Sequence, residues 1–258
     1  MNSSIVQINL LQFASVYLLL IIIIVIMKKS KVDQTKLLVV ASIRMSVQLV
    51  LAGLILTYIF KNPAWYFTVA YVGAMAVFSI VRAFKRSPWL NKKFKIVVAV
   101  SLAGSGVFVL LFFIIGVVGI NIFNPQYTIP LGGMIFGNAM TGITLGLKSF
   151  HDSIYSQRSK VETLLNLGVT PKKILAPFSN SALETALLPT MNSMLGMGLI
   201  SLPGMMTGQI LSGTLPMTAI LYQIAIMISV CTVVCLASFI TLNLGSRTLC
   251  NKKNQIEL

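Results

Sequence analysis

The stretch INLLQFASVYLLLIIIIVIMKK, residues 8–29, decides the fold class of this chain. Its apolar part, Ile8–Met27, matches the roughly 20 residues that a helix needs to span a bilayer. No basic residue precedes it, and Lys28 and Lys29 follow it, whereas a cleaved signal peptide has the opposite arrangement. We therefore expect an uncleaved first span whose N-terminus lies outside the cell.

The composition extends this conclusion to the whole chain. Hydrophobic residues make up 56% of the 258 residues and charged residues 10%, and the mean hydropathy is +0.89. Soluble domains carry about 25% charged residues, far more than this chain. The strands of a membrane barrel alternate between apolar and polar residues, whereas the apolar runs of this chain are continuous. We predict an all-α integral membrane protein, a polytopic helical bundle that forms a single domain over residues 1–258.

Six further apolar runs bring the expected number of spans to seven. Gly, Pro and Thr interrupt the run at 183–202, so six is the alternative count. The expected spans are Ile8–Met27, Leu37–Phe60, Ala64–Val81, Ile96–Ile120, Tyr127–Leu147, Leu183–Leu202 and Pro216–Leu244.

Basic residues occupy every second connection between these spans. Of the 20 Lys and Arg residues, all but Arg44 and Lys61 lie in those connections or in the tail, and 121–126 and 203–215 carry none. The positive-inside rule places the basic connections and the C-terminus in the cytoplasm. The net charge of +15 then faces anionic lipid heads and not nucleic acid. The basic regions are 28–36, 82–95, 148–182 and the tail after Leu244.

The longest basic connection contains a polar stretch, VETLLNLGVTPKK at 161–173. Apolar residues at near-helical spacing from Phe150 to Leu165 predict an amphipathic helix that continues inward from the fifth span. Gly168 suits a helix C-cap, and Thr170-Pro171 suits the start of another helix. We expect a helix, a tight turn and a short helix at the membrane surface, whose apolar residues pack on this protein or on another.

Glu162 and Gly168, with LGVTPKKI at 167–174, resemble the cytoplasmic coupling loop of ABC importer-type permeases. That loop has a Glu-Ala-Ala…Gly pattern and docks into a groove on the ATPase subunit, and here Thr163 and Leu164 stand in place of the alanines. A helix that lies on the lipid surface is the alternative. The ATPase-docking residues that the resemblance implies are Glu162, Leu165, Gly168, Thr170 and Pro171.

Four stretches together resemble the FetB-type permease family, the membrane subunits of bacterial ABC transporters linked to iron export, with plant relatives linked to aluminium tolerance. The resemblance implies a permease subunit in the bacterial inner membrane that exports iron or a related metal or solute. It also implies a separate ATP-binding subunit and a homodimer. The stretches are IPLGGMIFGNAMTGITLGL (129–147), LLNLGVTPKKIL (164–175), LLPTMNSMLGMGLISLPGMMTGQILSG (187–213) and YQI (222–224).

The stretch GITLGLKS, residues 142–149, has the residue types of a phosphate-binding loop but not its spacing. Three residues and not four separate Gly142 from Gly146, and Leu147 intervenes before Lys148. We therefore expect no ATP hydrolysis and no bound cofactor on this chain, and we expect ATP and Mg on the partner subunit.

Small residues on the fifth span are candidates for helix packing. Gly133 and Gly137, and again Gly142 and Gly146, are four residues apart, a spacing that lets helices approach closely. The close neighbour is either another helix of this chain or a face at the dimer interface or pathway.

Polar groups within spans are costly and often functional. Arg44 and Gln48 lie one turn apart in the second span, and Arg44 either reaches the lipid heads or pairs with Glu184 at the start of the sixth span. Three more polar residues either face a pathway or join helices: Asn138, Asn192 and Gln209.

The metal ligands of a transported ion are unknown from sequence. No group of His, Cys or carboxylates has metal-site spacing, and His151 is expected on the cytoplasmic surface. Methionines are dense at 191–206, where thioethers either suit Cu(I) more than iron or pack adaptably in a core. Two other functions remain possible: a stand-alone secondary transporter or channel that uses Glu184, and an intramembrane enzyme, for which no nucleophile–base pair is evident.

Overall fold

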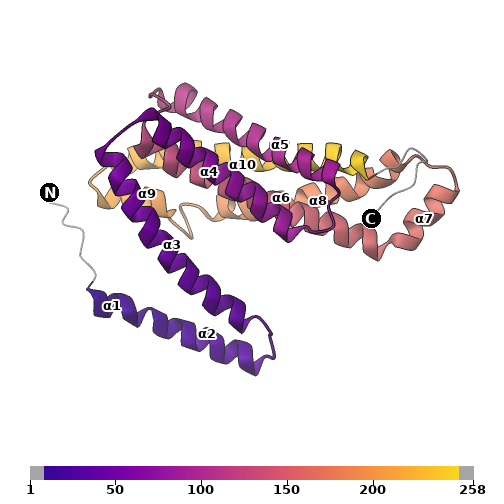
Figure 1. Cartoon of the computed structure of the whole chain (residues 1–258), viewed down its shortest axis with the longest axis horizontal. Helices are drawn as coiled ribbons and strands as arrows, with labels where there is room; N and C mark the ends of the chain where they lie inside the picture. Colours follow the sequence, from indigo (N-terminus) through magenta and orange to yellow (C-terminus); the bar gives the residue numbers. More distant parts are fainter. Residues whose placement is uncertain (1–8, 250–258) are drawn as a thin grey trace. The chain divides into compact units, whose positions relative to one another are not determined.

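The computed structural model describes residues 9–249, which form two compact units. Unit 1 contains residues 9–62 and 211–214, and unit 2 contains residues 63–210 and 215–249. The regular elements are helices (Figure 1), and none of the described residues belongs to a strand. The prediction of an all-α membrane protein is confirmed, whereas the organisation as one domain stays a prediction.

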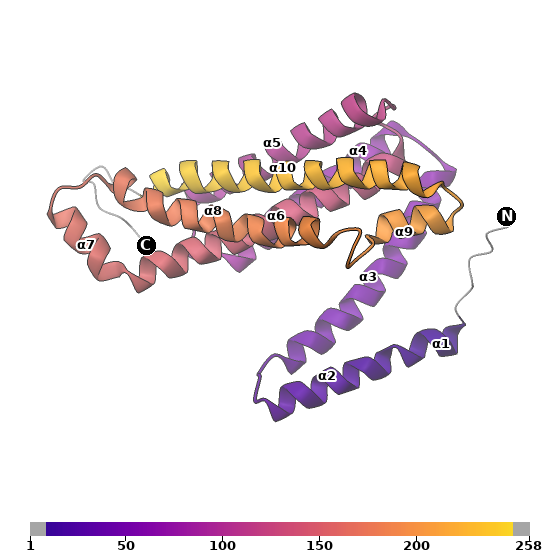
Figure 2. The same cartoon turned by 180° about the vertical axis from the view of Figure 1, so that it is seen from behind.

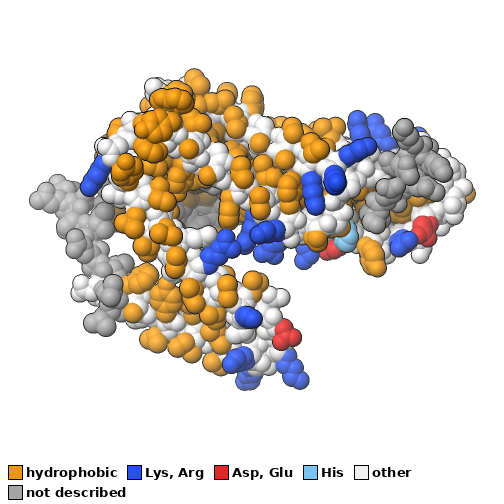
Figure 3. Space-filling view, viewed as in Figure 1, with side chains coloured by type: hydrophobic (Ala, Val, Ile, Leu, Met, Phe, Trp, Pro, Cys, Tyr) orange, Lys and Arg blue, Asp and Glu red, His pale blue; other side chains and the backbone are white. Residues whose placement is uncertain are grey.

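Unit 1 is built from three helices, α1 (Leu10–Ser15), α2 (Tyr17–Lys29) and α3 (Thr35–Lys61). In α2 no residue is buried, and in α3 the buried residue is Ile59. Helices that are apolar on every side and expose their side chains suit lipid as a solvent. Lys side chains gather near the turn between α2 and α3 (Figure 3), where the chain carries most of the basic residues of this unit.

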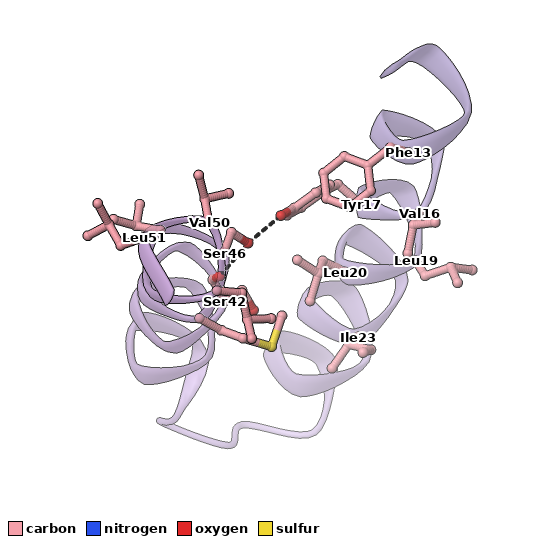
Figure 4. Close-up of a pocket in the computed structure, with 13 residues that line it drawn as sticks. Phe13, Val16, Tyr17, Leu19, Leu20, Ile23, Ser42, Ser46, Val50 and Leu51 are labelled. Carbon is pink, nitrogen blue, oxygen red and sulfur yellow. Dashed lines mark hydrogen bonds between the residues drawn. The ribbon is translucent and has the colours of Figure 1, made fainter. Parts of the chain in front are cut away.

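An apolar groove of about 820 Å³ runs between α1–α2 and α3. Figure 4 shows the hydroxyl of Tyr17 directed at that of Ser46 across the groove. Ser46 in turn donates to the backbone carbonyl of Ser42 at 2.9 Å, so Tyr17 is the donor in the first bond. Apart from these three residues the lining is apolar.

Unit 2 is a bundle arranged around α6. This helix packs against α4, α5, α8 and α10, an arrangement visible from both sides (Figures 1 and 2). The π-helical turn η1 extends α5, and α7 and α9 are short. The bounds are α4 Trp65–Arg86, α5 Lys92–Leu111, η1 Phe112–Val118, α6 Pro125–Ser156, α7 Arg158–Asn166, α8 Pro171–Gly196, α9 Gly204–Leu211 and α10 Pro216–Thr248.

Buried aromatic rings and glycines bring the helices of unit 2 together. The ring of Phe136 lies against Gly106 and the ring of Phe94 against Gly245, so closely that a Cβ at either glycine would overlap the ring. Both rings are almost fully buried. Tight helix packing of this kind replaces the hydrophobic drive that water would supply to a soluble core.

Five of the seven expected spans are long and apolar enough to cross a membrane by length and composition. They are Gln12–Lys29, Thr35–Lys61, Trp65–Arg86, Lys92–Val118 and Pro216–Thr248. Of the other two, the fifth falls within α6 and the sixth overlaps the second half of α8. These helices have 32 and 26 residues and are long enough at about 1.5 Å per residue, but they hold more Gly, Pro and hydroxyl residues. The count of seven and the orientation stay predictions.

The expected sixth span, Leu183–Leu202, is wrong in its bounds. Helix α8 begins at Pro171 and ends at Gly196, and Gly198 in the following break has a φ of 85°. Proline favours the first position of a helix, and a positive φ ends one. The helix after Thr170, expected to be short, is therefore the first part of a 26-residue helix.

Candidate functional site

Several helix ends meet at the basic end of unit 2. The side-chain amide of Asn91, the N-cap of α5, donates to the carbonyl of Thr248 at the end of α10, at 2.9 Å. The ring of Trp89 lies 4.9 Å from that of His151 on α6, so His151 is half-buried and not fully on the surface. Figure 3 shows Lys and Arg side chains over this end. The two basic connections of unit 2 and the end of α10 thus share one end, as the positive-inside pattern predicts.

Aromatic residues mark the opposite end of unit 2. The ring of Trp65 contacts that of Phe123 with centroids 6.2 Å apart, and the hydroxyl of Thr68 donates to the carbonyl of Phe123 at 3.1 Å. Tryptophan and tyrosine favour membrane interfaces. The two ends of the bundle therefore carry the two kinds of side chain that anchor a protein in a bilayer.

The apolar face of α7 is covered by its own chain. Val161 is buried, and Leu164 and Leu165 are half-buried against the core of unit 2. Leu167, just after the helix, is 73% exposed. Most apolar residues of the segment have thus found their partner within this protein, and Leu167 is the exposed exception. Leu167 does not fit the helical spacing of the apolar residues from Phe150 to Leu165. That misfit is the one feature of the sequence that could have indicated its exposure.

The turn after α7 has the geometry that the sequence predicts. Gly168 has a φ of 77°, its N–H donates to the carbonyl of Leu165, and the N–H of Val169 donates to that of Leu164. These two bonds form a Schellman motif. Thr170 is extended and Pro171 opens α8, although the hydroxyl of Thr170 makes no capping bond. Together they join the end of α7 to the start of α8 through a tight turn.

A polar surface remains outward on α7. Arg158 Nε lies 2.8 Å from Glu162 Oε1, and both side chains are exposed. The hydrogen bond and the negative charge of Glu162 raise the pKa of Arg158 above its ordinary value. Of the five residues expected to dock an ATPase, Glu162, Gly168 and Thr170 are exposed, Leu165 is half-buried and Pro171 is buried. Their docking role stays a prediction.

A polar cavity of about 360 Å³ opens between α6, α8, the break at 197–203 and α10. Among the predicted pathway residues, Asn138 lines it and Asn192, Gln209 and Glu184 do not. The other polar residues of the lining are Thr141, Thr190, Ser193, Ser201 and Gln223. Sequence reasoning missed Gln223, an amide in the first half of the apolar helix α10.

The remaining pathway candidates lie elsewhere. Glu184 and Asn192 are exposed on α8, and Gln209 is half-buried on α9. Arg44 and Gln48 are exposed on α3 in unit 1. Because Arg44 and Glu184 belong to different units, the proposed pair stays a prediction.

The four glycines of α6 have different surroundings. A Cβ at Gly142 would lie 2.5 Å from Val234 of α10, and a Cβ at Gly146 would lie 3.2 Å from Ala186 of α8. A Cβ at Gly133 would touch Met75 at 3.4 Å, and one at Gly137 would meet nothing within 4 Å. Gly142 and Gly146 thus lie at close helix contacts within the chain, while Gly137 lies on an open face.

That open face of α6 is not suited to lipid. The exposed large hydrophobic residues of the helix, Tyr127 and Tyr155, lie near its ends. Between them, exposed side chains include Asn138, Thr141 and Lys148. Polar groups are costly in hydrocarbon, so this face needs water or protein beside it.

Metal ligands do not cluster in the described part of the chain. Residues 9–249 contain no group of three or more His, Cys, Asp or Glu side chains able to hold a metal ion. Of the dense methionines, Met197 reaches the polar cavity, where Met134 and Met227 also contribute to the wall.

Comparison with known proteins gives the family. Residues 10–250 match the uncharacterised protein family UPF0014. The chain belongs to this family. Among its relatives, the probable iron export permease protein FetB of Escherichia coli (strain K12) is 32% identical over 213 residues, 83% of this chain and 81% of FetB. No solved structure matches the chain.

Further relatives come from another bacterium and from a plant. The membrane protein YjkA of Bacillus subtilis (strain 168) is 31% identical over 205 residues, 77% of this chain and 78% of YjkA. Protein ALUMINUM SENSITIVE 3 of Arabidopsis thaliana is 35% identical over 186 residues, 71% of this chain and 66% of the relative. The resemblance to FetB-type permeases is confirmed, and membership in a membrane protein family agrees with the apolar helices.

Proposed function

We propose that this UPF0014 protein is the membrane-spanning permease subunit of an ABC transporter in a bacterial inner membrane. It exports iron or a related metal or solute, and a separate ATP-binding subunit supplies the energy. The name of the FetB relative supports transport, and the structure of α7 supports the coupling to a partner.

The observation that carries the proposal is the two-sided character of α7. Its inner side is fixed, since Val161 is buried and the Schellman turn joins it to α8. Its outer side presents Glu162 together with exposed Leu167. A partner that moves the outer side therefore moves α8, and α8 lines the polar cavity through Thr190 and Ser193. Packed elements transmit such displacements because they do not deform continuously.

The open polar face of α6 supports a second copy of the chain. Asn138 and Thr141 are exposed at mid-helix. Each donates to a carbonyl of α6, but in lipid their side-chain oxygens would have no donor. In a homodimer, this face of each copy lines a shared pathway or the interface between the two.

Copurification tests the proposal. The tagged chain is extracted from its native membrane in mild detergent, and associated proteins are identified. We expect an ATP-binding cassette subunit with ATPase activity. The double variant Glu162→Lys, Leu167→Asp should lose it, because the change replaces the exposed contact without touching buried residues. Lys93→Gln, an exposed change at the same end of unit 2, is the control and should retain it.

A pure preparation without an ATP-binding subunit and without ATPase activity would contradict the proposal. The stand-alone transporter would then become the better account. Under that account Glu184→Gln should abolish proton-coupled transport, whereas under ours Glu184→Gln leaves ATPase recruitment intact.

A further inference from the structure

We propose that a pocket between the start of α8 and the end of α10 binds a phosphate ester, either the phosphate of an anionic lipid headgroup or a small soluble one. The two helices lie side by side in unit 2 (Figure 2), and the pocket has a volume of about 270 Å³. Its lining contains two basic residues, Lys172 and Arg247, and no acidic one. The inference goes beyond transport and does not depend on an ATP-binding partner.

The first turn of α8, a helix of 26 residues, offers a backbone donor to an anion. The N–H groups of Lys173 and Ile174 both donate to the carbonyl of Thr170. The hydroxyl of Thr170 makes no capping bond, and the N–H of Lys172 has no other acceptor in residues 9–249. A free N–H at the positive end of a helix dipole favours a phosphate group beside it.

A buried hydroxyl two turns further along α8 indicates a ligand independently. Ser179 is 6% exposed and lines the pocket. Thr185 and Ser193 on the same helix donate to carbonyls four residues earlier, whereas the hydroxyl of Ser179 makes no hydrogen bond within residues 9–249. Unlike Ser238 Oγ, it is not closed off from its surroundings. Buried polar groups normally have a partner, and a ligand in the pocket supplies one.

The end of α10 faces these donors with two more. Arg247 is exposed and forms no ion pair among the described residues. One turn earlier, Asn243 is half-buried, and its side-chain amide makes no hydrogen bond within the described chain. Both residues line the pocket. A guanidinium group binds phosphate through two parallel hydrogen bonds, and such charge-assisted bonds are the stronger ones in proteins.

The negative end of the α10 dipole is already compensated. The carbonyl of Thr248 accepts from the Asn91 amide at 2.9 Å, and the carbonyls of Ser246 and Arg247 accept from the N–H of Leu249. The positive charge of Arg247 also lies in the last turn, where it offsets the dipole. An anion in the pocket therefore meets donors and not unpaired carbonyls.

The described carboxylates of unit 2 lie outside the pocket. Glu162 pairs with Arg158, and Asp152 lies 3.6 Å from His151. Glu184 is on α8 beyond the lining residues. A volume of about 270 Å³ is near the lower limit of about 300 Å³ for organic ligands. The pocket thus suits a phosphate group that carries a small polar body.

Matched probes test the inference on the full-length protein in detergent with its copurified partners. Dioleoyl phosphatidate and dioleoylglycerol differ by a phosphate, as do glycerol 3-phosphate and glycerol. We expect the phosphate member of at least one pair to bind at least tenfold more tightly. Native mass spectrometry measures the lipid pair and calorimetry the soluble pair. Preferential binding of phosphatidate alone identifies a lipid headgroup, and that of glycerol 3-phosphate alone identifies a soluble ester.

Two substitutions with matched controls locate the bound phosphate. Arg247→Gln should weaken binding at least tenfold, because a charge-assisted hydrogen bond is lost. Arg86→Gln, the same change at an exposed residue of the same end, should preserve binding. Ser179→Ala should weaken binding about threefold without lowering the thermal unfolding midpoint, since its hydroxyl has no partner to lose. Ser229→Ala removes a hydroxyl that already donates to a carbonyl of α10 and should leave binding unchanged.

Equal losses in Arg247→Gln and Arg86→Gln would overturn the inference, because the basic surface as a whole would then attract phosphate. Equal binding within both probe pairs, or unchanged affinity in Ser179→Ala, would overturn it too. Phosphate-selective binding in a preparation without an ATP-binding subunit would uphold the pocket and contradict the proposed ABC transporter. A preparation with an ATP-binding subunit but no phosphate selectivity would do the reverse.

Discussion

The two units of this chain hold cavities of different character. The groove of unit 1, about 820 Å³, is the larger and is almost wholly apolar, while the cavity of unit 2, about 360 Å³, carries amides and hydroxyls. The helices differ in the same way, since α2 and α3 expose apolar side chains along their length and α6 exposes none of its large hydrophobic residues between Tyr127 and Tyr155. The helices of unit 1 therefore turn their apolar side chains outward, as lipid-facing helices do, and we propose that α6 and α8 carry the polar groups that serve transport.

Truncating one leucine in each unit tests this comparison most strongly. Leu102→Ala on α5 removes a fully buried side chain and should destabilise the protein by about 2 kcal/mol or more, because the cavity it leaves cannot fully collapse. Leu54→Ala on α3 removes a side chain that is 65% exposed and should cost less than about 0.5 kcal/mol. Thermal unfolding in mild detergent measures both. A comparable loss from Leu54→Ala would mean that unit 1 has a packing partner.

Two glycines of α6 sharpen the comparison within one helix. Gly142→Ala places a methyl group 2.5 Å from Val234 and should cost about 1–3 kcal/mol through overpacking. Gly137→Ala meets nothing within 4 Å and should be neutral or slightly stabilising in a single copy, because Ala favours the helix. The same unfolding assay applies. If a second copy covers the open face, Gly137→Leu should weaken the dimer in cross-linking experiments without unfolding the protomer.

The smallest effect concerns the turn after α7. Gly168→Ala forces a side chain into a φ of 77° and should cost about 1 kcal/mol locally. Hydrogen exchange at residues 161–175 should accelerate, while exchange in α5 and α10 stays unchanged. Equal acceleration throughout unit 2 would show that the turn is not a local element.

Much of the fold was predictable because the spans obey length and charge rules. The first span, the clustering of basic ends in unit 2 and the positive φ of Gly168 follow from local chemistry, which needs no knowledge of neighbours. The length of α8 was not predictable, because Glu184, Pro177 and Pro189 lower its apolar character and disguise one continuous helix.

The candidate site was harder to predict than the fold. Gln223 lines the cavity of unit 2, but no spacing rule distinguishes this one amide within an apolar helix. Leu165, which was expected to contact an ATPase, is half-buried within this protein. Leu167, which lies outside the helical repeat, is exposed. Which apolar residue of a short helix is covered depends on neighbouring helices, and a single sequence does not specify these.

The central claim is that the outer side of α7 contacts an ATP-binding subunit. The most direct test is photo-cross-linking. A benzophenone is attached to the cysteine of Leu167→Cys, in a background without other cysteines, and native membranes are irradiated. Val100→Cys on α5, 65% exposed, is the control. Our account predicts that the position-167 probe cross-links an ATP-binding cassette protein and that the position-100 probe does not. Cross-linking of lipid alone at position 167 would contradict it.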